Sequence, residues 1–216
     1  MTTPPSPGSE SLRHLPQQTR SQERFNRILE AAAQVFAEVG YEKASTEAIA
    51  TRASTSIGSL YRFFPDKSAI LYALAESYAE QLREVLAEAF APALSHLPLT
   101  QVINQAVDDF EQFYITQPGY QVVFAQTRLS PDLQKLDKRL DSEIALHLEK
   151  FLAARQSTLS PEQIRLVALI SVETAGSLQI LSLTQTEAFR QQVMSETKTL
   201  LTRYLHPLFP DPPPNP

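Results

Sequence analysis

Small polar side chains, a phenol and a cation lie close together between residues 56 and 67. Ser56, Gly58 and Ser59 open a short helical segment, and Tyr61 and Lys67 follow nearby. Small residues let a helix backbone approach the wall of a groove closely, and hydroxyl groups and N-terminal amides donate hydrogen bonds to phosphate oxygens. These residue types at this spacing therefore indicate contact with a phosphate backbone.

Two short predicted helices position these side chains. Thr46 is the expected N-cap of a helix over 46–53, and a second helix is expected over 57–63 after a brief turn. Longer amphipathic helices flank the pair, one before Gly40, its expected C-cap, and one from about 67 to 90. Short helix pairs are common in all-α cores, but this arrangement is also the pattern of a helix-turn-helix.

The rest of the chain is predicted to be helical as well. No strand pattern or internal repeat is found, and prolines fall between the helical patterns or in the two polar ends. The fold class is therefore all-α, with disordered tails expected at 1–19 and 207–216. Apolar residues recur at helical spacing over five further segments: 100–116, 119–128, 132–155, 161–183 and 187–205.

Composition excludes several kinds of chemistry. The 216 residues are 43% hydrophobic, enough for a core, and the absence of cysteine rules out disulfides, thiol catalysis and cysteine-ligated metals. The four histidines are scattered, so we expect no metal site, no cofactor and no catalytic residues. The longest uninterrupted apolar run is Leu166–Ile170, and no apolar stretch lies in 1–20, so neither a membrane span nor a signal peptide is predicted. A soluble, cytoplasmic protein is expected.

The net charge of −5 is unevenly distributed. Residues 1–67 hold 8 Lys and Arg against 7 Asp and Glu, whereas residues 68–216 hold 11 against 17. A nearly neutral N-terminal third on an acidic body can still bind DNA if its few cations are well placed.

The segment from Gly40 to Leu71 resembles the DNA-binding domain of the tetracycline-repressor (TetR) family of bacterial transcriptional regulators. The matching pieces are ILEAAAQVFAEVGYEKAS, TEAIATRA and SIGSLYRFFPDKSAIL, within roughly 21–75. The resemblance implies a homodimer that places one recognition helix of each subunit in the major groove of a palindromic, double-stranded operator. It further implies a repressor that leaves the operator when an unidentified small-molecule effector binds. The implied domains are 20–66 for DNA binding and 67–206 for effector binding and dimerisation.

The resemblance also assigns DNA contacts. Thr46, Tyr61 and Lys67 are expected to bond phosphates. Arg62 either reads guanine or is a solvated surface residue, and Phe63, at a position that often hydrogen-bonds in the family, is expected to touch a thymine methyl. The full expected set is Thr46, Ser56, Ile57, Gly58, Ser59, Tyr61, Arg62, Phe63 and Lys67.

Other residues near the motif have two interpretations. Arg20 and Arg24 either lie on a solvated face or touch phosphate or the minor groove. Tyr61 alternatively packs in the core, and Lys67 alternatively is a helix-start lysine without a partner. Ser54 stands in the turn where the family often has glycine, so we expect it to adopt the turn at a conformational cost.

The larger domain offers candidates for an effector pocket. Aromatic residues at helical spacing are either core or pocket, and His147 lies on an apolar face. Glu173 continues an apolar stripe, so it either lines a pocket for a cationic or hydroxylated effector or lies across a dimer axis. The expected pocket set is Phe110, Phe113, Tyr114, Tyr120, Phe124, His147 and Glu173.

The expected dimer surface lies on the last two predicted helices, chiefly on the helix over 161–183. This helix mixes small with apolar residues, which lets two helices approach closely, although a central core helix has the same composition. The expected interface residues are Ser171, Ala175, Leu178 and Leu181.

Two other classes of function stay open. One is an all-α enzyme with Glu173 and His147 as acid and base, although no nucleophile–base pair, metal set or phosphate loop accompanies them. The other is an interaction protein that keeps the fold without binding DNA. The presence of the motif residues Gly58, Tyr61 and Lys67 argues against this alternative.

Overall fold

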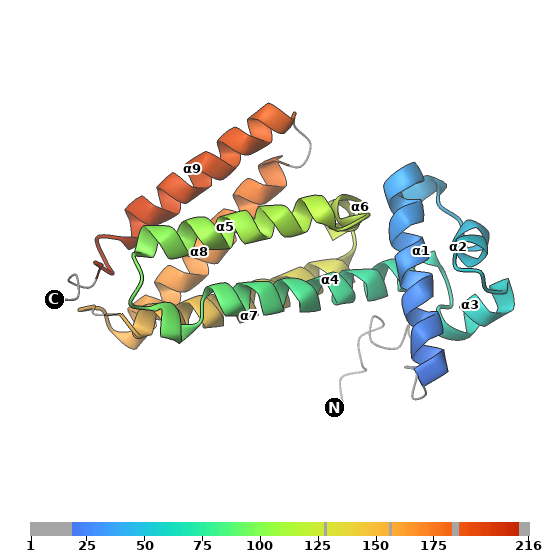
Figure 1. Cartoon of the computed structure of the whole chain (residues 1–216), viewed down its shortest axis with the longest axis horizontal. Helices are drawn as coiled ribbons and strands as arrows, with labels where there is room; N and C mark the ends of the chain where they lie inside the picture. Colours follow the sequence, from blue (N-terminus) through green and yellow to red (C-terminus); the bar gives the residue numbers. More distant parts are fainter. Residues whose placement is uncertain (1–18, 128, 156, 183–185, 212–216) are drawn as a thin grey trace, which may run out of the picture. The chain divides into compact units, whose positions relative to one another are not determined.

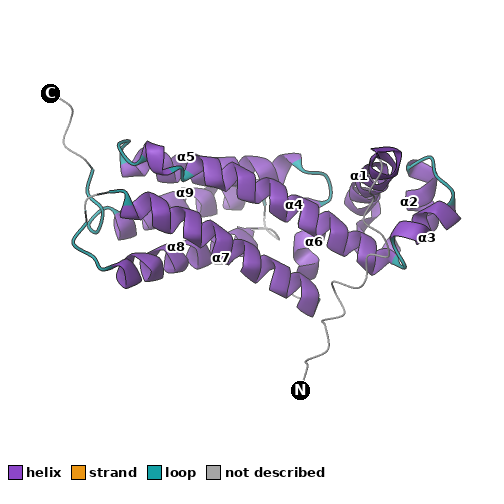
Figure 2. Cartoon of the chain, turned by 90° about the horizontal axis from the view of Figure 1, so that it is seen from below, coloured by secondary structure: helices purple, strands orange, loops and turns teal. Residues whose placement is uncertain are grey.

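The computed structural model describes residues 19–127, 129–155, 157–182 and 186–211. Every regular element in these ranges is a helix (Figure 2), so the all-α prediction is confirmed. The expected N-terminal tail lies outside the described residues up to residue 18. The elements are α1 (Thr19–Lys43), α2 (Thr46–Arg52), α3 (Ile57–Phe63), α4 (Lys67–Ala89), the 3-10 turn η1 (Pro92–Leu94), α5 (Leu99–Thr116), α6 (Tyr120–Thr127), α7 (Pro131–Ala153), α8 (Pro161–Ser182) and α9 (Glu187–Leu205).

Proline and glycine set several helix boundaries. Pro131 and Pro161 are the first residues of α7 and α8, where the missing amide proton has no helical partner to lose. Gly40, the predicted C-cap, has a φ of 76° and a ψ of 166°, so α1 is kinked there and a short second piece continues to Lys43. The predicted helix positions therefore hold, apart from shifts of a few residues at their ends.

The described chain forms two compact units. The first comprises the chain up to Ala79 with Gln117–Leu136, and the second comprises Glu80–Thr116 with the chain from Asp137 onward. Helices α1, α2, α3 and α6 belong to the first unit and α5, α8 and α9 to the second, while α4 and α7 each contribute to both. The first unit therefore holds the whole helix-turn-helix and extends past the boundary predicted after Asp66.

An apolar core fixes the helices of the first unit. Phe25 of α1 stacks on Phe64, with ring centroids 5.0 Å apart. Ile49 of α2 and Leu60 of α3 are completely buried. Burying these side chains removes apolar surface from water and holds both short helices in place, although neither is long enough to be stable alone. Ala50 of α2 and Ala53 at its end are buried as well.

Helix α6 packs on α1 through a glycine. Gly119 precedes α6 with a φ of 74°, and a Cβ atom at this position would lie 2.6 Å from the carbonyl oxygen of Ala33 in α1. The neighbouring Pro118 carbonyl accepts a hydrogen bond from the Tyr78 hydroxyl, and burial raises the pKa of Tyr78. A larger residue at 119 has no room and an unfavourable backbone conformation.

In the second unit, α5 and α8 both pack against α9 (Figure 1). Arg190 of α9 is 9% exposed and pairs with Glu111 of α5 at 3.0 Å and with Glu187 one turn earlier. Burial raises the pKa of the nearby Tyr114 to about 12, although the positive charge of Arg190 opposes the shift. A satisfied ion pair thus lies within the apolar contact of α5 with α9.

The C-terminal segment is packed as far as Asp211. Phe209 is completely buried. Arg155, 6% exposed, donates to two loop carbonyl oxygens at 2.7 and 2.8 Å and pairs with Asp211 at 2.9 Å. The predicted disordered tail is therefore not found over 207–211, because one phenylalanine and one aspartate anchor a segment whose composition is otherwise proline-rich; residues 212–216 lie outside the described part.

Helix α8 is the one described helix that is long and apolar enough to span a membrane, by length and composition alone. The sequence prediction of no membrane span considered uninterrupted apolar runs, whereas α8 reaches this length with polar residues interspersed. Within the structure, 33% of its most apolar stretch is buried. Core helices of soluble proteins pass the same test, so the helix is weak evidence for a membrane. Its exposed apolar surface still needs an explanation.

We expect Gly119→Ala to lower the free energy of unfolding by about 2 kcal/mol or more, because the added methyl group meets a backbone carbonyl at a positive φ. Gly58→Ala is the matched control, since nothing lies within 4 Å of its Cβ position and alanine favours a helix. Chemical denaturation at one fixed protein concentration measures both variants. Equal stability of the two would contradict the close contact of α6 with α1.

Candidate nucleic-acid interface

Ser45, rather than the predicted Thr46, is the N-cap of α2. The Ser45 Oγ accepts a hydrogen bond from the amide of Ala48 at 3.1 Å, and the Ser45 backbone is extended. Thr46 is therefore the first residue of the helix, and its hydroxyl does not cap it. Serine and threonine are both good caps, so residue type alone does not separate adjacent candidates.

The turn between α2 and α3 is tight. Ser54 has a φ of 50°, which is the left-handed conformation, as expected from its place in the turn. Ser56 then caps α3: its Oγ accepts a hydrogen bond from the amide of Ser59 at 3.2 Å and donates one to the Ser59 hydroxyl at 2.9 Å. The two serines fix where α3 begins and how it leaves the turn.

One face of α3 is exposed. Ile57 and Tyr61, which are 37% and 39% exposed, lie one turn apart, and Gly58 and Arg62 beside them are exposed as well. We call these four residues the α3 strip. The strip combines an apolar side chain, a residue without a side chain, a phenol and a guanidinium, and it carries no carboxylate.

Phe63 points away from the α3 strip. It is 7% exposed, and its ring lies edge-on to Phe25 with centroids 6.0 Å apart. The predicted contact of Phe63 with a thymine methyl is therefore wrong for this structure. The helical period places residue 63 with Leu60 on the buried face, which is why an apolar residue is suited to the position.

A hydrogen bond joins α2 to the α3 strip. The hydroxyl oxygens of Thr46 and Tyr61 lie 3.0 Å apart although the residues are 15 positions apart in the chain. The resemblance implies a phosphate contact for each of them. The structure thus brings these two predicted contacts to one point on the surface.

Lys67 has three partners that the sequence did not predict. Its Nζ donates hydrogen bonds to the carbonyl oxygens of Tyr41 at 2.6 Å, Glu42 at 3.2 Å and Ala44 at 2.9 Å. These carbonyls belong to the end of α1 and the link to α2, where unpaired carbonyl groups favour a cation. An ammonium has three N–H donors, so all three are in use here, and the predicted phosphate contact stays a prediction that would require one of these bonds to be given up.

Two further contacts fix the start of α4. The Lys67 ammonium lies 4.4 Å from the centre of the Tyr41 ring. Asp66 caps α4, since its Oδ1 accepts hydrogen bonds from the Ser68 hydroxyl at 2.6 Å and the Ala69 amide at 2.8 Å. Burial disfavours the charged carboxylate, but these hydrogen bonds outweigh it and hold the pKa of Asp66 below its ordinary value.

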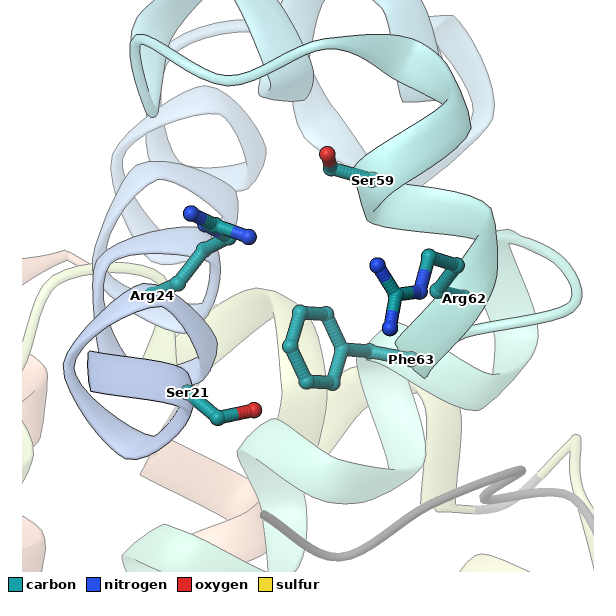
Figure 3. A pocket seen from close by; sticks show the side chains of 5 residues that line it. All are labelled: Ser21, Arg24, Ser59, Arg62 and Phe63. Atoms are coloured by element: carbon teal, nitrogen blue, oxygen red, sulfur yellow. The ribbon is translucent and has the colours of Figure 1, made fainter. Parts of the chain in front are cut away.

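A small hollow of about 90 Å³ lies between α1 and α3. Figure 3 shows the guanidinium groups of Arg24 and Arg62 directed toward each other across it. For both arginines the sequence left a solvated position and a DNA contact open, and the structure brings them together. The lining residues are Ser21, Arg24, Ser59, Arg62 and Phe63.

The predicted effector-pocket residues are divided between the two units. Glu173 is exposed, and the others are buried or half-buried. Those in the first unit are Tyr120 and Phe124, whose rings stack 5.8 Å apart. Those in the second unit are Phe110, Phe113, Tyr114, His147 and Glu173.

Sequence reasoning did not single out Gln179, a buried amide on α8. Its side chain is 1% exposed, and among the described residues neither Nε2 nor Oε1 has a hydrogen-bond partner. Buried amides are nearly always paired, so this one calls for a water molecule or a ligand group. The only indication of a buried amide in the sequence is that Gln179 lies on the same face of α8 as Ala168 and Val172.

The predicted dimer residues face different ways. Leu181 is 49% exposed, and Ala175 and Leu178 are half-buried. Ser171 is buried and donates a hydrogen bond to the carbonyl of Val167 in its own helix, so its prediction as an interface residue is wrong here. The exposed face of α8, called the α8 stripe below, carries Leu166, Leu169, Ile170, Glu173, Ser177 and Leu181.

Glu173 and His147, the candidate acid and base of the enzyme alternative, are not paired with each other. In the part of the chain that the structure describes, Glu173 and His147 share no hydrogen bond or ion pair, and no group of three or more His, Asp or Glu residues could hold a metal. Glu173 lies near two other carboxylates instead. Burial raises the pKa of Asp141 to about 7, and the negative charges of Asp137 and Glu173 add to the shift.

Two regions of the chain match known families. Residues 28–74 match the bacterial regulatory proteins of the tetR family, and residues 98–205 match a tetracyclin repressor-like C-terminal domain. The first region contains α2 and α3, and the second contains α5 to α9.

Individual proteins support the same relationship. The HTH-type transcriptional repressor KstR of Mycobacterium tuberculosis is 26% identical over 129 residues, which are 57% of this chain and 57% of KstR. The HTH-type transcriptional regulator BetI of Cronobacter sakazakii is 25% identical over 144 residues, 63% of this chain and 71% of BetI. A TetR-family transcriptional regulator from Streptomyces coelicolor, of known structure, is 28% identical with a TM-score of 0.65 over 86% of this chain and 99% of that one.

We expect Lys67→Met to lower the free energy of unfolding of the DNA-free protein by about 2 kcal/mol, because three carbonyl oxygens lose a charged donor. Lys43→Met, at an exposed lysine in the last turn of α1, is the matched control and should change stability little. Chemical denaturation compares the two. If Lys67→Met were as stable as wild type, the three hydrogen bonds would not stabilise the fold, and the phosphate contact would be the expected role of Lys67.

Proposed function

This chain belongs to the tetR family of bacterial DNA-binding transcriptional regulators, and from that premise we propose that it is a homodimeric repressor. Two copies bind a palindromic operator, each with α3 in the major groove, and release it when a small molecule binds the second unit. The observation that carries the proposal is the α3 strip of Ile57, Gly58, Tyr61 and Arg62, which is exposed and free of carboxylates.

The chemistry of the α3 strip suits a DNA groove. An α-helix fits the major groove, and nothing lies within 4 Å of the Cβ position of Gly58, so the backbone of α3 can approach the groove wall. Ile57 offers apolar contact to a thymine methyl. The hydrogen bond between Thr46 and Tyr61 uses one of their two hydroxyl protons, so the pair offers one hydrogen bond to a phosphate oxygen. Most of the affinity should be electrostatic and should fall steeply with added salt.

We place the dimer interface on the α8 stripe. Leu166, Leu169 and Ile170 are 56%, 40% and 41% exposed, and Phe189 of α9 is 39% exposed. Apolar helices need cover, and a second copy related by a two-fold axis supplies it with the same surface. Burial of α8 against a second copy would explain its apolar character without burial in a membrane, and it agrees with a cytoplasmic location.

The effector is proposed to bind in the second unit. The unpaired amide of Gln179 favours a ligand group that both donates and accepts hydrogen bonds, such as a hydroxyl or an amide. The half-buried Phe110 and His147 are further candidate contacts. For release, the effector must bind the DNA-free conformation more tightly than the DNA-bound one. The transcriptional repressor KstR supports repression, although the relative FasR of Mycolicibacterium smegmatis is a transcriptional activator.

Selection from random DNA duplexes, followed by sequencing at two salt concentrations, tests the function. We expect one palindrome to be enriched, with weaker binding at higher salt. Gly58→Glu should then weaken binding to it by on the order of 100-fold, because a carboxylate faces the phosphates while the free protein has room for the side chain. Fluorescence anisotropy measures the affinity.

Gln101→Glu is the matched control for Gly58→Glu, since it adds the same charge at an exposed position of α5 and should bind as wild type does. A folded protein that enriches no duplex would favour the interaction-protein alternative. Equal losses in both variants would mean that net charge, and not the α3 strip, sets the affinity.

We expect the double variant Leu166→Lys and Ile170→Lys to be a monomer, because like charges would meet across the two-fold axis. The wild type should sediment at twice the chain mass of 24.1 kDa in analytical ultracentrifugation. Ile115→Lys, at a residue that is 52% exposed on α5, is the control and should stay dimeric. A wild-type monomer, or a double variant that remains dimeric, would refute this interface.

A further inference from the structure

We propose that the hollow between α1 and α3 is a seat for one phosphate group of the DNA backbone, held jointly by Arg24 and Arg62. The inference rests on the proposed DNA binding and adds to it the group that these two arginines hold. It assigns Arg62 to phosphate instead of guanine, and it gives the first helix of the motif a defined role at the DNA.

The charges that face the hollow favour an anion in it. The guanidinium groups of Arg24 and Arg62 turn toward each other (Figure 3), and neither has a carboxylate partner among the described residues. Arg52, in the same unit, instead forms two hydrogen bonds with Glu38, at 2.5 and 2.8 Å. Two guanidinium groups that face one space repel each other, and an anion between them would turn this repulsion into attraction. Guanidinium groups match the geometry of phosphate oxygens, often with two hydrogen bonds each.

The lining of the hollow also suits a phosphate group. The Ser59 hydroxyl accepts a hydrogen bond from Ser56 at 2.9 Å, so its own proton is directed elsewhere and can be donated to an oxygen in the hollow. Ser21 offers a second hydroxyl from α1, and Phe63 supplies an apolar wall. The volume of about 90 Å³ exceeds the roughly 10–15 Å³ that admits one water molecule.

The hollow lies beside the surface proposed to bind DNA. Arg62 belongs to the α3 strip and also lines the hollow, so the seat borders the surface proposed to enter the groove. Its guanidinium turns back toward α1 (Figure 3), whereas a guanine reader must extend beyond α3 to the base edges. A phosphate beside the groove meets both arginines at once. A free inorganic phosphate has the same chemistry and is the other possible source of the group.

The test combines variants with neutral phosphates. In the selected operator, single backbone phosphates are replaced one at a time by uncharged methylphosphonates. We expect wild type to lose about tenfold in affinity at one phosphate of each half-site. Arg24→Gln and Arg62→Gln should each bind unmodified DNA several-fold more weakly and lose less than wild type at that phosphate, because one of its two partners is gone, and the double variant should lose nothing more there.

Arg27→Gln is the matched control. Arg27 is an exposed arginine of the same helix that does not line the hollow, so the variant should keep the wild-type pattern of sensitive phosphates. The affinity of the double variant Arg24→Gln and Arg62→Gln should also depend less steeply on salt. The slope of the logarithm of the binding constant against the logarithm of the salt concentration should be shallower by about 0.9 for each phosphate that is no longer held.

Several results would overturn the seat. Arg24→Gln and Arg62→Gln could lose sensitivity at different phosphates, or Arg62→Gln could change one selected base pair and leave the phosphate pattern intact. Inorganic phosphate could instead raise the melting temperature of wild type but not of the variants, while no single methylphosphonate lowers the affinity for DNA. This pair of results would show that the hollow binds a free anion and not the DNA backbone. If wild type enriches no duplex, the proposed function itself fails and the DNA seat fails with it.

Discussion

Three hydrogen bonds donated by the Lys67 ammonium are the constraint on which the DNA-facing surface depends. They bind the start of α4 to the end of α1 and to the link that leads into α2. Helices α2 and α3 lie between these two points in the chain, so the junction limits where both can lie. With α1 and α4 joined, Leu60 and Phe63 fill the core and the opposite face of α3 remains for DNA. A cation that satisfies helix-end carbonyls also gains from their partial negative charge.

The helices could be predicted because their signals are local. Apolar spacing, the proline at the start of α8 and the glycine kink in α1 all lie within a few residues of what they determine. The errors concern contacts between distant residues. Nothing near Lys67 indicates that its partners lie more than twenty positions earlier, and nothing in a proline-rich end indicates that Asp211 pairs with Arg155. The same holds for Arg24 and Arg62, whose shared hollow exists only once α1 and α3 are packed.

The two proposed binding surfaces differ in the force that each would use. The α3 strip and the arginine seat offer cations and hydroxyls on a unit without a large excess of negative charge, which suits a polyanion. The α8 stripe offers leucine and isoleucine, which suits burial against a second copy. Helices α4 and α7 contribute residues to both units, so the proposed coupling of effector to DNA would pass through them.

Amide hydrogen exchange of the full chain, with and without the selected duplex, tests the central claim that α3 is the DNA-binding surface. The account predicts slower exchange on DNA binding in 56–62 and in the first turns of α1, with the peptides of α5 unchanged. Exchange in 56–62 that stays the same while the duplex is fully bound would show that DNA binds elsewhere and would contradict the account.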